Sequence, residues 1–355
     1  MSSAFTPALI AVIGGCVIAV VAFVPFVAMS YRRRGEMTFW RSILWFVAVI
    51  YVMALWTYTL LPFPETRDVT CVPLQTAPFA FVGDIAHYGV GSVGALMQNP
   101  AVVQVSLNVV LFMPLGWFIR HLAGRGVVVA TLIGFVVSML IEVTQVTGIW
   151  GLYSCAYRVF DVDDLIANTA GALLGSIVGM LLWRRSERRL DAGAPRPITA
   201  PRRFVGILSD VAVLWITGWV VIAVRLGIAL LDGRPELAIP EEVFGVAAYA
   251  LPIIVQLLSV LIGGVTIGER IVLIRAVHGS MPAMVARPVR FLLGIGGYMV
   301  LLASESFVSS MLLPVLVLVS FIMVFTTRNH RGLAAVAARM DVEDVRVRGN
   351  DRAAS

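Results

Sequence analysis

Long apolar stretches dominate this 355-residue sequence and constrain its fold more than any other feature. A helix of about 20 apolar residues crosses the hydrocarbon core of a bilayer. Nine stretches approach or exceed that length: 6–29, 39–61, 103–119, 127–149, 164–183, 204–231, 243–264, 290–303 and 311–325. Because 59% of the residues are hydrophobic and only 14% are charged, a water-soluble globular enzyme is excluded. We therefore predict an all-α, polytopic transmembrane helix bundle with nine spans, five followed by four.

All 27 basic side chains are arginines, which suggests a GC-rich bacterium, and their distribution predicts the orientation of the chain. Cytoplasmic loops of membrane proteins carry an excess of basic residues. If the N-terminus lies outside, all but four arginines fall on the cytoplasmic side; the exceptions are Arg67, Arg158, Arg225 and Arg234. We therefore expect the N-terminus outside, the C-terminus in the cytoplasm, and a multi-pass protein of the bacterial inner membrane. The positive charge then reflects topology, so we expect no nucleic-acid partner.

An arginine- and proline-rich segment, RRSERRLDAGAPRPITAPRR at 184–203, separates the fifth span from the sixth. A polar segment of this composition is typical of a solvated linker at the anionic inner leaflet. We predict a five-span membrane domain over 1–185, a cytoplasmic linker over 186–201, a four-span membrane domain over 202–345 and a polar tail over 346–355.

Polar side chains gather at the predicted outer ends of the third, fourth and fifth spans. This cluster consists of Asn108, Glu142, Gln145, Arg158, Asp161, Asp164 and Asn168. Polar groups inside a bilayer are costly, so they indicate a functional site or a necessary internal pairing. Pairing of Glu142 with Arg158, or of Asp164 with Asn168, would explain single residues structurally, and Asp163 or Asp164 could cap the fifth span. Seven such groups exceed what packing requires, so we favour a binding pocket in which Arg158 contacts an anionic group.

Motifs for metal or cofactor chemistry are not found in the sequence. Oxygen ligands from Glu142, Asp161, Asp163 and Asp164 would suit magnesium or calcium, but their spacing matches no EF-hand loop. The sequence contains no Walker loop, nucleophile elbow, zinc motif or CxxC pair. We therefore predict neither a metal nor a cofactor.

Two of the three cysteines, Cys71 and Cys155, lie in predicted outer loops. A disulfide can persist on that side of the membrane and would hold the long loop over the polar cluster. A bridge requires a close approach of the two backbones that a sequence does not reveal, so both the bridged and the free state remain open. In the same long loop, residues 85–97 could form a short helix along the interface.

Three motifs in the first half resemble the VanZ-like membrane proteins. NVVLFMPLG begins at Asn108, IEVTQ occupies 141–145 and RVFDVDDLIANTAGALLG begins at Arg158, in the family's order and over roughly 40–183. The namesake of that family raises resistance to the glycopeptide teicoplanin. The resemblance thus implies that the seven cluster residues form the site. It also implies membrane lipids, lipid-linked cell-wall molecules or lipophilic glycopeptides as partners.

The second half resembles the RDD domain over roughly 202–345. The residues that carry this resemblance are Arg203, Asp210, Thr266, Gly268 and Arg270. Glu269 stands where that family carries lysine, and the segment from Arg331 lacks the family's HD pair. Some RDD domains are linked to ion exchange, which implies a role for Asp210 inside the sixth span. The structural alternative is a salt bridge of Asp210 with Arg203 or Arg270 at the inner leaflet.

These observations lead to three functional hypotheses. The first is an accessory protein of the cell envelope that modulates susceptibility to teicoplanin-type glycopeptides through the outer polar pocket. The second is a cation-coupled transporter in which Asp210 and Glu142 carry protons. The third is a membrane enzyme for lipid-linked substrates, with Glu142 and Asp164 as acid and base. We favour the first and expect no enzyme, because nothing in the sequence identifies a nucleophile or a reaction.

Overall fold

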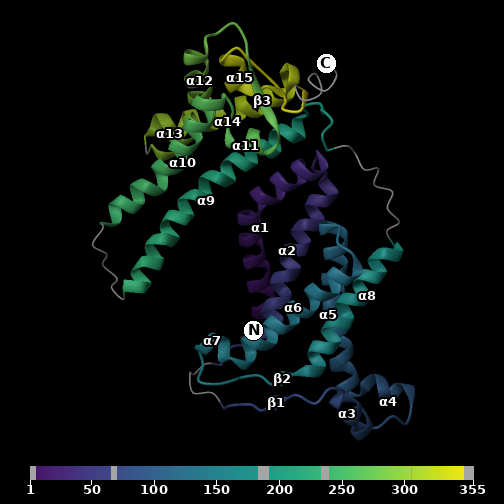
Figure 1. The fold of residues 1–355 in the computed structure, drawn as a ribbon. Helices are drawn as coiled ribbons and strands as arrows, with labels where there is room; N and C mark the ends of the chain where they lie inside the picture. Colours follow the sequence, from purple (N-terminus) through teal and green to yellow (C-terminus); the bar gives the residue numbers. More distant parts are fainter. Residues whose placement is uncertain (1–4, 65–69, 183–191, 233–239, 305, 348–355) are drawn as a thin grey trace. The chain divides into compact units, whose positions relative to one another are not determined.

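The computed structural model describes residues 5–64, 70–182, 192–232, 240–304 and 306–347 (Figure 1). Within them almost all regular structure is helical, with only short strands. In the part of the chain that the structure describes, eight helices are long and apolar enough to cross a membrane, and a bent helix pair would make a ninth span. The predicted all-α membrane bundle is therefore confirmed.

The chain divides into two compact units. The first contains Met1–Ala19 and Phe39–Arg188, and the second contains Val20–Thr38 and Arg189–Ser355. Helix α1 (Phe5–Arg34) contributes to both units, whereas the sequence placed it wholly in the first domain. Part of the expected linker, residues 186–191, and residues 348–355 of the expected tail lie outside the described residues.

The first unit is built mainly from helices α2, α5, α6 and α8. Its elements after α1 are α2 (Phe39–Leu60), β1 (Leu74–Gln75), α3 (Ala80–Tyr88), α4 (Val93–Gln98), α5 (Pro100–Ala123), α6 (Val127–Val146), α7 (Gly148–Gly151), β2 (Phe160–Asp161) and α8 (Val162–Leu182). Local chemistry explains the ends of α5. The side chain of Asn99 accepts the first N–H groups, and Gly124 ends the helix in the left-handed region at φ 66°.

Glycines allow the backbones of α5 and α8 to touch. A Cβ atom on Gly175 would lie 1.8 Å from the Met113 carbonyl oxygen, and one on Gly171 would lie 2.2 Å from that of Val109. Gly116 makes the reciprocal close approach from α5 to α8. Small residues at such spacing are how membrane helices pack closely where lipid removes the hydrophobic driving force. This contact positions the polar groups at the ends of both helices.

The second unit continues from α1 with α9 (Ala200–Asp232), α10 (Glu241–Gly263), α11 (Ile267–Ile271), β3 (Ile274–His278), α12 (Ala283–Leu292), α13 (Ile295–Ala303), α14 (Phe307–Thr326), the 3₁₀ turn η1 (Arg328–His330), α15 (Gly332–Ala337) and β4 (Met340–Asp344). Strands β3 and β4 pair antiparallel, with Ile274 opposite Asp344. Val27 and Tyr31 of α1 pack with Val272 and Ile274 in the buried core of this unit.

The eighth predicted span, 290–303, differs from the structure. It forms the second part of a broken pair in which α12 and α13 are bent by 43°. The break contains Gly294, whose φ of −124° and ψ of −128° are not helical. Arg290, the first residue of the predicted span, is buried and forms an ion pair with Glu269. The apolar pattern therefore identified α13, but it did not reveal that Arg290 at the end of α12 is held in a buried ion pair.

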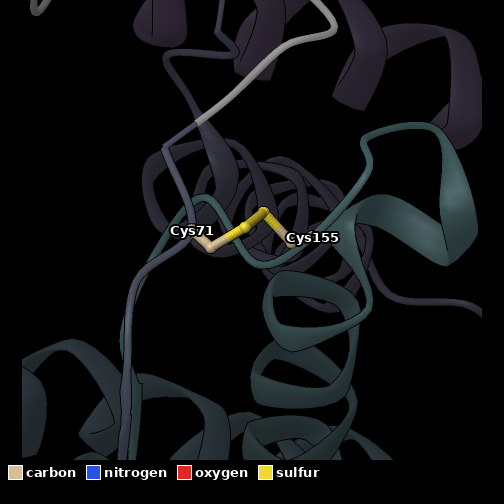
Figure 2. Close-up of a disulfide and its surroundings, with 2 residues drawn as sticks. All are labelled: Cys71 and Cys155. Carbon is tan, nitrogen blue, oxygen red and sulfur yellow. A yellow bond between two sulfur atoms is a disulfide. The ribbon is translucent and has the colours of Figure 1, made fainter.

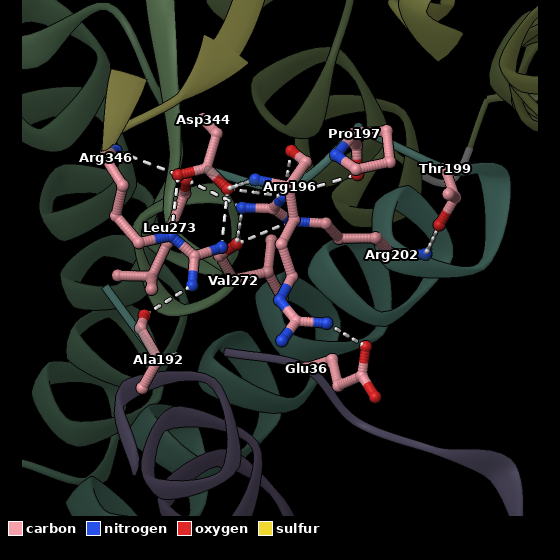
Figure 3. A network of polar contacts seen from close by, with 10 residues as sticks. All are labelled: Glu36, Ala192, Arg196, Pro197, Thr199, Arg202, Val272, Leu273, Asp344 and Arg346. Carbon is pink, nitrogen blue, oxygen red and sulfur yellow. Dashed lines mark hydrogen bonds and ion pairs between the residues drawn. The ribbon is translucent and has the colours of Figure 1, made fainter. Parts of the chain in front are cut away.

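A network of arginine contacts joins α9 and β4 to the segment that follows α1 (Figure 3). Asp344 accepts hydrogen bonds from Arg202 Nη1 at 2.8 Å and from Arg346 Nη2 at 2.6 Å. Burial alone would raise the pKa of Asp344, but these guanidinium groups outweigh it and lower the pKa to about 2. Arg196, expected in the linker, pairs with Glu36. Arg346, at the start of the predicted tail, is thus part of the folded unit.

Candidate functional site

The carboxylates of the polar cluster meet where α5, α6 and α8 converge. Asn108 Nδ2 on α5 donates to Asp164 Oδ1 on α8 at 2.5 Å. The backbone N–H of Asp161 donates to Glu142 Oε2 on α6 at 3.2 Å. The charges of Asp164, Asp161 and Arg158 all act on Glu142. The hydrogen-bond donors that reach Glu142 and Asp164 are thus neutral, and the cluster keeps an excess of acidic groups.

A second polar contact lies one helical turn further along the same two helices. Asn168 follows Asp164 by four residues, and Ser138 precedes Glu142 by four. Asn168 Nδ2 donates to Ser138 Oγ at 2.9 Å. Both residues are buried, and within the described residues Asn168 Oδ1 has no hydrogen-bond partner. The structural alternative expected from the sequence was a pair of Asp164 with Asn168. Asn168 instead pairs with Ser138 on α6.

Residues at the start of α8 organise the neighbouring loop. The side chain of Asp161, directly before the helix, accepts the N–H of Asp163 at 2.8 Å. Asp163 in turn accepts the N–H groups of Phe79 at 2.6 Å and Phe81 at 2.9 Å. The cap of α8 is thus Asp161, not Asp163 or Asp164. Burial raises the pKa of Asp161, the N–H of Asp163 opposes this, and the charges of Asp163 and Asp84 add to it.

Arg158 and Gln145 hold the end of α2. Arg158 donates from Nη1 to the Thr59 carbonyl at 2.6 Å and from Nη2 to the Leu61 carbonyl at 3.4 Å. Gln145 Nε2 donates to the same Thr59 carbonyl at 2.7 Å. The last carbonyls of a helix lack partners within it, and these side chains supply them. Both Nη atoms of Arg158 therefore serve the backbone rather than an ion pair with Glu142.

A disulfide fastens the long loop beside this cluster (Figure 2). Cys71 and Cys155 are bonded, with their Cα atoms 5.5 Å apart, which decides the question that the sequence left open. Shortly after Cys71, β1 pairs in parallel with β2, and Gln75 lies opposite Asp161. The loop is thus tied directly to the residue that precedes α8.

Two participants were not indicated by the sequence, and a third was indicated in a different role. Ser138 and the Thr59 carbonyl carry no sequence signal, and Asp163 was considered only as a cap or metal ligand. Among the described residues, no group of three histidine, cysteine or acidic side chains is placed to hold a metal ion. The acceptors of the cluster are its three carboxyl groups, Glu142, Asp161 and Asp164, while its amides and Arg158 act as donors.

In the second unit, Asp210 on α9 is buried and held by neutral donors. Its Oδ1 accepts Gln256 Nε2 at 2.8 Å and the Gly268 N–H at 2.6 Å. Its Oδ2 accepts the Thr266 hydroxyl at 2.6 Å. Gly268 is required here because a Cβ atom would lie 2.7 Å from the Asp210 Cγ. The structure thus brings Asp210, Thr266 and Gly268 together, whereas the sequence led us to expect Arg203 or Arg270 as the partner of Asp210.

The arginines of this region bind other groups. Arg203 Nη1 and Arg290 Nη2 both contact Glu269 Oε1, at 2.5 and 2.6 Å. Burial alone would raise the pKa of Glu269, but the two guanidinium charges lower it to about 2. Arg270 Nε instead donates to the Ser259 hydroxyl at 2.9 Å. Glu269, which departs from the RDD pattern, is thus the centre of a buried ion-pair triad.

Comparison with known proteins adds one relationship. Residues 46–183 match the model of the family described as VanZ/LLP1. No curated protein and no solved structure matches the chain. The matched segment includes α5, α6 and α8 and every residue of the polar cluster. The chain is therefore a multi-pass membrane protein with a VanZ-like segment over residues 46–183.

Proposed function

We propose that this protein acts in the bacterial cell envelope, where its polar cluster contacts lipid-linked cell-wall molecules or lipophilic glycopeptides. By doing so it changes susceptibility to teicoplanin-type antibiotics. The observation that carries this proposal is the convergence of Glu142 and Asp164 from two helices, where the hydrogen-bond donors found among the described residues are neutral. A membrane protein retains such groups at a cost, which function explains better than packing does.

The chemistry of the cluster favours one part of such a ligand. Carboxylates accept hydrogen bonds from hydroxyl and amino groups and repel phosphates. Sugar hydroxyls or amines therefore fit the cluster better than a pyrophosphate. Because the Nη atoms of Arg158 bind carbonyls at the end of α2, we assign Arg158 a positioning role instead of contact with an anionic group.

Two observations support an outer location for the cluster. The arginine distribution favours an outer location for the loop between α6 and α8. The disulfide between Cys71 and Cys155 belongs to the same side, and such bonds persist in oxidising compartments. We therefore propose the inner membrane of a bacterium, with the N-terminus outside and the C-terminus in the cytoplasm.

Antibiotic susceptibility tests the proposal. Glu142→Gln and Asp164→Asn preserve side-chain size and remove the charge, whereas Glu242→Gln changes an exposed glutamate at the start of α10. In a susceptible host, the intact chain should shift the inhibitory concentration of teicoplanin, and both cluster variants should abolish the shift at equal membrane abundance. Glu242→Gln should retain it. Cluster variants that behave like the intact chain would refute the proposal.

A second candidate function is cation-coupled transport by the RDD-like half, over 202–345. It is favoured by Asp210, a buried carboxyl group in a candidate span that has neutral hydrogen-bond donors. Such a group gains or loses a proton, or binds a small cation, at lower cost than a carboxylate fixed by arginine. In proteoliposomes containing a pH-sensitive dye, a sodium gradient should drive proton flux that Asp210→Asn abolishes and Glu242→Gln retains. An equal flux through both variants would exclude this function.

A further inference from the structure

Residues 79–98, which we call the interfacial hairpin, join the disulfide-bridged loop to α5. They contain α3 and α4, and neither helix has a buried residue, although most of their side chains are apolar. Val93 and Met97 are each 72% exposed, and Val82 and Val90 are more than half exposed. A contiguous exposed apolar surface of this kind marks a surface that another apolar phase covers.

The interfacial hairpin is held firmly at both ends by buried polar side chains. Asp163 accepts the N–H groups of Phe79 and Phe81 at the start of α3. Asn99 donates from Nδ2 to the Ile85 carbonyl at 2.9 Å. Its Oδ1 accepts the Ala101 N–H and so caps α5. Asp163 and Asn99 are both buried, so these anchors fix the hairpin relative to α5 and α8.

These anchors also determine the depth of the hairpin relative to a membrane. Asp163 lies in the first turn of the candidate span Val162–Leu181. Asn99 directly precedes the candidate span Pro100–Ala123. Because both ends are tied to points where spans begin, the hairpin lies at the boundary between the hydrocarbon core and the headgroups.

The exposed surface of the hairpin continues into a surface that faces lipid. Helices α3 and α4 both pack against α5. Within its candidate span, α5 exposes Leu107 and Val110, each by about 60%. The hairpin itself contains one carboxylate, Asp84, and no arginine. Its composition thus suits apolar chains rather than charged headgroups or a charged protein partner.

We propose that the interfacial hairpin is embedded in the bilayer surface, with Val93 and Met97 among the upper acyl chains. Lipid, and not another protein, covers the exposed apolar surface of the hairpin. Asp163, which holds the hairpin, lies between Asp161 and Asp164, so the embedded hairpin keeps the polar cluster at headgroup depth. This inference does not depend on the proposed antibiotic function, because it concerns only where the chain meets the membrane.

Site-directed fluorescence in nanodiscs tests this placement on the full chain. In a Cys16→Ala background with the disulfide intact, single cysteines at Val93 and Met97 would carry an environment-sensitive nitrobenzoxadiazole label. Leu107→Cys, inside the α5 span, is the lipid control, and Asn329→Cys, an exposed polar position in η1, is the aqueous control. The nanodiscs contain phosphatidylcholine and phosphatidylglycerol with a nitroxide on either the shallow or the deep part of the acyl chain, and iodide serves as the aqueous quencher.

The labels on the hairpin should lose fluorescence to shallow nitroxides more than to deep ones and be protected from iodide. The label at Leu107 should respond more to deep nitroxides, and the label at Asn329 only to iodide. Iodide quenching of the hairpin labels equal to that at Asn329 would overturn the proposal. Protection from both iodide and nitroxides would also overturn it, because protein, such as a second copy of this chain, would then cover the hairpin.

Discussion

Replacing Gly175 by alanine should disrupt the α5–α8 contact and, with it, the polar cluster. The new Cβ atom would lie 1.8 Å from the Met113 carbonyl oxygen, a backbone atom that cannot rotate away. Restoring a contact of 3.0 Å requires the helices to separate locally by about 1.2 Å. Overpacking of this kind costs about 2–3 kcal/mol. If the separation reaches the ends of the helices, the 2.5 Å hydrogen bond from Asn108 to Asp164 lengthens to about 3.7 Å and is lost.

The matched control is Gly227→Ala in α9, where a Cβ atom would meet nothing within 4 Å. Alanine is the better helix former, so this change should leave stability unchanged or raise it by about 0.5–1 kcal/mol. Both variants would be unfolded by heat in the same detergent, with helicity measured by circular dichroism. Gly175→Ala should unfold at a clearly lower temperature than Gly227→Ala. Equal unfolding temperatures would show that α5 and α8 do not touch through their backbones and would refute the packing argument.

Two further predictions concern buried links. Cys71→Ser opens a bridge between residues 84 apart in sequence and should lower the free energy of unfolding by up to about 4–5 kcal/mol. Denaturant titration of the intact protein and the variant, with and without reductant, would measure this loss. Equal stability of the reduced and oxidised intact protein would contradict the prediction. Glu269→Gln leaves Arg203 and Arg290 buried without their counter-charge. The free energy of unfolding, measured by thermal unfolding, should therefore fall by about 3–5 kcal/mol. A fall of less than about 1 kcal/mol would refute the ion-pair triad. Because the pKa of Glu269 falls from 4.5 to about 2 on folding, its stabilising contribution is complete above pH 4.5 and is lost as the pH falls towards 2. Between about pH 2 and 4.5 the free energy of unfolding of the intact protein should therefore rise with pH. The Glu269→Gln variant should lack this contribution to the rise.

For the first unit, the sequence predicted the participants of the site better than their partners. Asn108, Glu142, Asp161 and Asp164 do converge, because helical periodicity and span ends place them at one depth. Their pairings were predicted less well, because Arg158 found unsatisfied carbonyls at the end of α2. Which donor meets which acceptor depends on the rotation of each helix, and hydropathy does not contain that information.

For the second unit, hydropathy located the long helices but did not reveal which charged residues beside them are buried in polar contacts. Arg290 was predicted to begin a span, because the apolar residues after it dominate the local average. Its burial depends on Glu269, which approaches it from α11. The same holds for Arg346, which was predicted to begin the polar tail and instead binds the buried carboxylate of Asp344.

The sequence by itself determined that this chain belongs in a bilayer and where eight of its nine predicted spans fall, because the cost of exposing polar groups to hydrocarbon acts on each residue separately. It also predicted which polar residues share an end of the bundle. Only the tertiary structure decided that Cys71 meets Cys155, that Arg203 neutralises Glu269 rather than Asp210, and that α5 and α8 touch at glycines. These features depend on distances between segments remote in sequence, and packing alone brings such segments together.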